Sequence, residues 1–70
     1  MTAAYDDIFP AVPIGSPNAL TPYEIWQAVG KWAEVNVKRR LDELAQIGRI
    51  KGQVRRVAQG GFAWVYWRDT

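Results

Sequence analysis

Between residues 34 and 47, apolar residues recur at the three- and four-residue spacing of an amphipathic α-helix. Counted at about 100° per residue, they form one stripe along this segment. The stripe consists of Val37, Leu41, Leu44, Ala45 and Ile47. Arg39 points directly away from it, whereas Lys38 and Arg40 flank it. Gly48 ends the pattern, so we predict a helix over residues 34–47 with one side facing the core.

A shorter helix precedes this one, and specific residues mark both of its ends. Thr21 is a favoured N-cap residue, and Glu24, three residues later, completes a capping box. Pro22 occupies the first helical position, where its fixed φ suits the helix and its missing N–H costs nothing. Gly30 fits a C-terminal cap, so the pattern predicts a two-turn helix over residues 22–29.

From Arg49 onward the pattern changes from helical to β-like. The runs "RIKGQVRRVA" and "FAWVYWR" are rich in β-branched and aromatic residues, and they flank "QGG". This arrangement predicts a β-hairpin over residues 50–67 with a tight glycine turn. In the second run one face carries Phe62, Trp64 and Tyr66, and the other carries Ala63, Val65 and Trp67. Both faces are apolar, and periodicity leaves open whether both are covered or one is exposed for binding.

Residues 1–19 contain three of the four prolines, which lack the N–H that helices and sheets require. We therefore expect an arm rather than a long helix or strand. Ile8, Phe9, Val12 and Ile14 make this segment too apolar for a fully disordered tail. Some of these side chains should pack on the domain, through a short turn at residues 6–9 or one short extended piece.

Composition narrows the classes of function. A chain of 70 residues forms one domain at most. It has no cysteine and no histidine, so a thiolate metal site and Ser–His or Cys–His catalysis are excluded. We expect no enzyme activity, no metal, no cofactor and no small-molecule substrate. No apolar run reaches the roughly 20 residues of a membrane span, and no signal-peptide pattern is present. These features predict a cytoplasmic protein that does not associate with a membrane.

The net charge of +2 is distributed unevenly along the chain. Residues 1–30 carry three acidic residues and no basic one, which gives −3. Residues 31–68 carry all nine basic residues against three acids, which gives +6, and Asp69 restores the total. Such asymmetry favours an anionic partner for the second half of the chain.

Helix, short turn, helix and β-hairpin follow one another in residues 21–67. This order and spacing resemble the winged helix-turn-helix superfamily of DNA-binding domains. "TPYEIWQAVG" resembles the first helix of the helix-turn-helix, "NVKRRLDELAQIGRI" the recognition helix and its exit, and "VRRVAQGGFAWVYW" the wing. Bacterial winged-helix repressors place Val, Leu, Leu, Gly and Leu or Ile at the positions of Val37, Leu41, Leu44, Gly48 and Ile50.

The resemblance implies an α+β fold, a small winged helix in which the helix-turn-helix is followed by a two-stranded hairpin wing. Residues 1–19 would be a partly ordered, Pro-rich N-terminal arm, and residues 20–70 the domain. Two features depart from the family. An additional helix normally precedes the helix-turn-helix, and here it is vestigial, replaced by the arm or supplied by a partner chain. The turn "GKWAEV" is also one residue longer than the commonest version.

For function, the resemblance implies a regulator of transcription in a bacterium, a phage or a mobile element, with double-stranded DNA as its partner. The helix 34–47 would read the major groove, where Asn36 suits adenine and Arg39 suits guanine. The hairpin would contact the DNA backbone or the minor groove. The residues assigned to DNA contact are Asn36, Lys38, Arg39, Arg40, Lys51, Arg55 and Arg56.

Several alternatives remain open. The basic helix face could be merely solvated, with ion pairs Lys38–Asp42 and Arg39–Glu43. The same fold could serve protein–protein interaction through the apolar arm and the aromatic strand 62–67, with a homodimer or another protein as partner. Binding of RNA or a single strand by that strand is a third alternative. The residues assigned to such interactions are Trp64, Tyr66 and Trp67.

Overall fold

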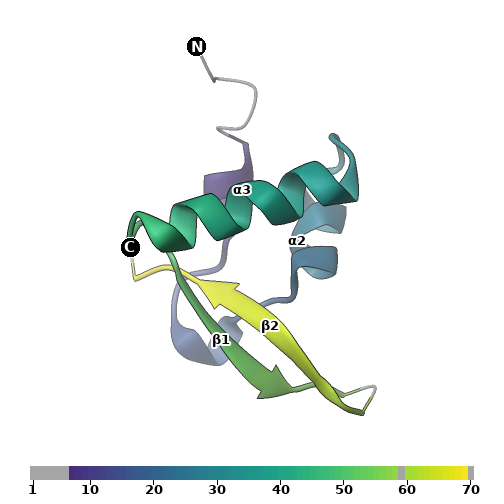
Figure 1. Cartoon of the computed structure of the whole chain (residues 1–70), viewed down its shortest axis with the longest axis vertical. Coiled ribbons are helices and arrows are strands. Elements are labelled where there is room, and N and C mark those ends of the chain that lie inside the picture. Colours follow the sequence, from purple (N-terminus) through teal and green to yellow (C-terminus); the bar gives the residue numbers. More distant parts are fainter. Residues whose placement is uncertain (1–6, 59, 70) are drawn as a thin grey trace.

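The computed structural model describes residues 7–58 and 60–69 and has an α+β architecture. Three helices precede a two-stranded antiparallel hairpin in the described residues, and α3 crosses in front of α1 and α2 (Figure 1). The hairpin extends away from the helices. The elements are α1 (Ile8–Ala11), the 3₁₀ turn η2 (Ser16–Asn18), α2 (Pro22–Val29), α3 (Glu34–Gln46), β1 (Lys51–Arg56) and β2 (Phe62–Trp67).

Helix α2 begins and ends at the predicted residues. The backbone N–H of Thr21 donates to the Glu24 carboxylate at 2.9 Å, and the Glu24 N–H donates to the Thr21 hydroxyl at 3.2 Å. This reciprocal pair satisfies two of the N–H groups that a helix start leaves without partners. Gly30 has a φ of 77°, a left-handed conformation that a residue without Cβ adopts at little cost. The predicted capping box and C-terminal cap are both confirmed.

The turn between α2 and α3 is held by an aromatic side chain. The indole N–H of Trp26 on α2 donates to the carbonyl of Trp32 at 2.9 Å. Trp32 itself has a φ of 61°, which is uncommon for a residue with a side chain. The bond from Trp26 therefore helps to fix the direction in which the chain enters α3.

Helix α3 has the predicted core-facing side, but its C-terminal end differs. Val37, Leu41 and Leu44 are buried, whereas Ile47 is 65% exposed, so its predicted place in the apolar stripe is wrong. The reason is the helix end: the Gly48 N–H donates to the carbonyl of residue 45, and the N–H of residue 49 donates to the carbonyl of residue 44. These two bonds form a Schellman motif, which turns the chain back at Gly48. Ile50 thereby enters the core in place of Ile47.

The predicted hairpin is confirmed, and its register determines which residues share a face. Lys51 pairs with Trp67 at the base, and Arg56 pairs with Phe62 near the turn. Only one edge of the sheet is extended by another segment among the described residues. Leu20 and Tyr66 exchange backbone hydrogen bonds of 3.1 and 2.8 Å on the β2 side. The N-terminal segment thus fixes β2, while β1 forms the outer edge.

The N-terminal segment also contributes to the core. Ile8 and Val12 are fully buried and join the side chains of α2, α3 and the hairpin. The predicted turn at residues 6–9 is a helical turn from residue 8 to residue 11, and residue 6 lies outside the described residues. Arg49 and Arg68 each lie 4.9 Å from the ring centroid of Phe9, which fastens α1 to the end of α3 and to the end of the hairpin.

Candidate nucleic-acid interface

The nine basic residues fall into two groups according to their contacts within the chain. Six of them bind another described residue: Lys31 binds Asp7, Arg40 binds Glu43, Lys51 binds Asp69, Arg49 and Arg68 lie on Phe9, and Arg55 binds Ser16 and Gln53. Lys38, Arg39 and Arg56 are exposed and make no hydrogen bond, ion pair or ring contact with any residue that the structure describes. These three are the cations that no described residue engages, whereas Lys31 and Lys51 form exposed surface ion pairs that an external anion can displace.

The four predicted contact residues of α3 lie on different sides of the helix. Asn36, Arg39 and Arg40 border a hollow of about 170 Å³ together with Glu43. Lys38 is four residues from Asp42 and so shares the other flank, which faces the hairpin. Sequence proximity of the basic triplet therefore does not produce one cluster.

Arg40 is the member of the triplet that α3 itself engages. Its guanidinium donates to the Glu43 carboxylate at 3.1 Å and is only partly exposed. The pairs expected from sequence, Lys38–Asp42 and Arg39–Glu43, do not form within the described part of the chain. The acidic residues of α3 therefore leave Lys38 and Arg39 without an internal partner.

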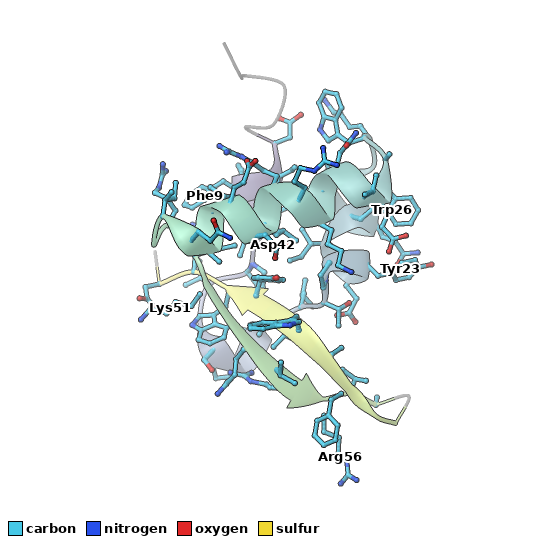
Figure 2. The ribbon with its side chains drawn as sticks, in the orientation of Figure 1. Phe9, Tyr23, Trp26, Asp42, Lys51 and Arg56 are labelled. Carbon is cyan, nitrogen blue, oxygen red and sulfur yellow. The ribbon has the colours of Figure 1, made fainter. Side chains whose placement is uncertain are left out.

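A hydrogen bond connects α3 to the hairpin. The Tyr66 hydroxyl on β2 donates to the Asp42 carboxylate at 2.8 Å. Burial raises the pKa of Tyr66, and the adjacent Asp42 carboxylate raises it further, so the phenol remains a neutral donor. Gly52 on β1 lies against the Tyr66 ring. The approach is so close that a Cβ at residue 52 would be 2.8 Å from a ring carbon. Asp42, which points toward the hairpin in Figure 2, thus fixes the hairpin relative to α3.

One face of the hairpin carries an apolar surface beside a cation. Val54, Phe62 and Trp64 are 49%, 74% and 54% exposed, and we call these three residues the hairpin patch. The register places Arg56 opposite Phe62 on the same face. Arg56 lies near the tip of the hairpin, far from the labelled residues of the helices (Figure 2).

The opposite face of the hairpin is turned toward the N-terminal segment. Arg55 donates to the Ser16 carbonyl at 2.8 Å and to the Gln53 side chain at 2.9 Å, and it also contacts the Ser16 hydroxyl. Its guanidinium lies 4.9 Å from the ring centroid of Trp67. Although the sequence assigned Arg55 to DNA contact, its donors are directed at the protein. No local pattern indicates this, since Ser16 is 39 residues away.

The three aromatic residues predicted for interaction have different environments. Tyr66 is 3% exposed and forms part of the core, and Trp67 is half-buried beneath Arg55. Trp64 is the exposed member. Periodicity left open whether both faces of strand β2 are covered. In the structure both faces are covered at the base of the hairpin, and one face is exposed toward its tip.

A groove separates the C-terminal half of α3 from the hairpin. Its volume is about 670 Å³, and the lining includes aromatic rings and polar groups. The aromatic side chains that line it are Trp64, Tyr66 and Trp67, and the polar ones include Asp42, Gln46 and Gln53. The groove therefore continues from the hairpin patch to the exposed side of α3.

The charge of the two elements beside this groove is unequal. In residues 34–46 three basic residues are balanced by three acidic ones, whereas residues 49–58 contain four basic residues and no acid. The hairpin is therefore the more positive element, and an anionic partner would be attracted to it first.

Comparison of the chain with protein-family models, curated proteins and solved structures gives no match. Among the residues that the structure describes, no helix combines the length and the apolar character needed to cross a membrane.

Proposed function

We propose that this protein is a small winged-helix regulator of transcription that binds double-stranded DNA. Helix α3 lies in the major groove, and the hairpin formed by β1 and β2 contacts the flanking backbone. The observation that carries the proposal is the position of the three unengaged cations. Lys38 and Arg39 lie on α3, and Arg56 lies on the hairpin next to it.

The arrangement of the elements supports the proposal. Two helices joined by a short turn are followed by a hairpin, an order compatible with a winged-helix layout. The bond between Tyr66 and Asp42 would keep the helix and the wing in one orientation. A fixed orientation matters because a rigid pair of elements can match the groove and the backbone of DNA together.

The three unengaged cations divide between base reading and phosphate contact in this proposal. Arg39, on the outward side of α3, makes a bidentate contact with guanine, and Asn36 beside it reads adenine. Lys38 and Arg56 neutralise phosphates and set the register of the protein on the duplex. Arg40 and Arg55 hold internal contacts and act mainly on the shape of the site, whereas Lys51, in an exposed ion pair with Asp69, can add a phosphate contact.

If the protein were instead a protein-interaction module, its exposed apolar surface would be smaller than the sequence indicated. Ile8 and Val12 of the arm are buried in the protein's own core, so among the described residues the exposed apolar surface of that module consists of Ile14 in the arm and the hairpin patch. A single winged-helix module buries about 600–1,000 Å² of protein surface on DNA, so a homodimer or a partner protein would increase the specificity.

An NMR titration of the isotope-labelled chain with random and genomic duplexes at low salt tests the proposal. We expect shifts concentrated at residues 34–40 and near Arg56. The variant Arg39→Ala should reduce them, whereas Arg49→Ala should have a smaller effect, because it removes the same charge from a side chain that lies on Phe9. Absence of binding to any duplex at low salt would refute the proposal.

A further inference from the structure

The hairpin patch is not explained by contact with duplex DNA. Major-groove binding uses α3, and backbone contact uses Arg56, yet Val54, Phe62 and Trp64 present large apolar surfaces to solvent. Val54 is paired with Trp64, and Phe62 is the next residue on the same face, so the three side chains are contiguous. A contiguous exposed apolar surface on a small protein is typical of a binding site.

The ring of Trp64 is held in place rather than loosely exposed. It stacks on Tyr66 with a centroid distance of 6.3 Å and an interplanar angle of 19°. Tyr66 is in turn fixed by its bond to Asp42. The indole is therefore flanked by the nearly parallel Tyr66 ring, and the side chain is still 54% exposed. An aromatic ring with a neighbouring ring beside it and an exposed surface is suited to stacking on another flat ring.

The charges around the patch favour a polyanion over an apolar protein surface. Arg56 lies opposite Phe62 and has no partner among the described residues, and Lys38 lies on the flank of α3 that faces the hairpin. An apolar partner would bury Arg56 without compensation, whereas a phosphate would neutralise it.

The groove next to Trp64 is lined by polar groups as well as by aromatic rings. Asp42, Gln46 and Gln53 line it together with the aromatic rings. Asp42 already accepts a hydrogen bond from Tyr66, and Gln53 accepts one from Arg55. The Gln46 amide is therefore the group best able to pair with the edge of a base, which an apolar side chain cannot use. Stacking surface, unengaged cation and polar groove together match an unpaired nucleotide.

We propose that the hairpin patch binds unpaired DNA bases, which stack on Trp64 and Phe62 while Arg56 contacts the adjoining phosphate. The proposal takes its ligand, DNA, from the proposed function, but it uses a different surface of the molecule. The chain would then bind DNA that contains both a duplex and an unpaired segment more tightly than a fully paired duplex.

Fluorescence anisotropy of labelled DNA tests this with three probes: a single strand of about 12 nucleotides without self-complementarity, the corresponding blunt duplex, and that duplex with an unpaired bulge. The variants are Trp64→Ala and Phe62→Ala in the patch, and Arg39→Ala on α3. Tyr23→Ala is the matched control, because Tyr23 is an exposed aromatic residue on α2. Phe62 is the most exposed of the patch, so Phe62→Ala keeps the test valid if Trp64→Ala unfolds the protein.

We expect Trp64→Ala to weaken binding of the single strand and of the bulged duplex by roughly 5-fold to 150-fold, the range that corresponds to one stacked base. Binding of the blunt duplex should change less than about 2-fold, since no base is unpaired there. Arg39→Ala should produce the reverse pattern, and Tyr23→Ala should leave all three affinities unchanged.

Three results would overturn the inference. The first is that the wild-type chain does not bind the single strand, and the second is that both patch variants bind it as well as the wild type. The third is concentration-dependent self-association that the patch variants abolish, with no single-strand binding, which would make the patch a protein interface. Loss of duplex binding alone would instead refute the major-groove proposal and leave the patch proposal standing.

Discussion

The hydroxyl of Tyr66 on β2 donates a hydrogen bond of 2.8 Å to the carboxylate of Asp42 on α3. The two residues are 24 positions apart, and their bond joins the hairpin to the helix across the groove. Tyr66 is buried while Asp42 is exposed, so loss of the hydroxyl leaves a carboxylate that water can still solvate. The Tyr66→Phe variant should therefore lower the free energy of unfolding by about 1 kcal/mol.

Urea denaturation of the wild type and of Tyr66→Phe measures this difference. Tyr23→Phe is the matched control, since the Tyr23 hydroxyl accepts one bond from Gln27 on the exposed surface. Its removal should cost less than about 0.5 kcal/mol. Equal costs for the two variants would show that the bond between Tyr66 and Asp42 stabilises the fold no more than a surface hydrogen bond does.

The same bond predicts a dependence of stability on pH. Burial and the Asp42 carboxylate raise the pKa of Tyr66 in the folded state, so the neutral phenol is favoured there. Its contribution is complete below the pKa of an unfolded tyrosine, about 10, and decreases as the pH rises above that value. The difference in unfolding free energy between wild type and Tyr66→Phe should thus shrink in alkaline solution. A constant difference from neutral to strongly alkaline pH would contradict this.

Gly52 is predicted to be intolerant of even one methyl group. An added Cβ would lie 2.8 Å from the ring of Tyr66, whose hydroxyl is anchored and whose ring is buried. Gly52→Ala should therefore cost about 1–3 kcal/mol of stability through overpacking. In a double-mutant cycle, the cost of Gly52→Ala should fall when Tyr66 is replaced by Ala. Additive costs would mean that the glycine is required for a different reason.

The adjacent arginines of β1 should separate stability from DNA binding. Arg55→Ala removes bonds to Ser16 and Gln53 and the contact with Trp67, and should lower stability by about 1–3 kcal/mol. Arg56→Ala should change stability by less than about 0.5 kcal/mol. It should weaken binding to all duplexes similarly and reduce the slope of the salt dependence by about 1.

Thermal unfolding measures the stability of the Arg55→Ala and Arg56→Ala variants. Anisotropy titrations at several salt concentrations measure their DNA binding. Because the residues are neighbours and both are arginines, each variant serves as the control for the other. A stability loss for Arg56→Ala, or an unchanged stability for Arg55→Ala, would reverse the assignment made from their contacts.

Arg39 should contribute to sequence choice. Arg39→Ala should cost about 1–3 kcal/mol of binding free energy at a preferred site and relax the choice of base at one position. Arg49→Ala is the control with the same change in charge, and it should have a smaller effect that is independent of sequence. Selection of preferred duplexes from a random pool, before and after the substitution, provides the measurement. Unaltered preferences for Arg39→Ala would argue against major-groove reading by this residue.

Local signals in the sequence were sufficient for α2, the core-facing side of α3 and the hairpin, but not for α1 or η2 in the proline-rich arm. The capping box at Thr21 and the glycine at residue 30 set the limits of α2, since caps act on neighbouring backbone groups. The helical spacing of Val37, Leu41 and Leu44 predicted the core side of α3. Alternation and a glycine pair predicted the hairpin, because both follow from bond geometry within a few residues.

Other features depended on contacts between distant residues, and only the tertiary structure decided them. Arg55 and Arg56 are equivalent in the sequence, yet the pleat directs Arg55 toward Ser16, 39 residues earlier, and Arg56 to the other face. Ile47 fits the apolar stripe, but the reversal at Gly48 places Ile50 in the core instead. Whether a basic side chain is bound within the protein or free to contact a partner depends on its neighbours in space. The order of charges along the chain does not show these neighbours.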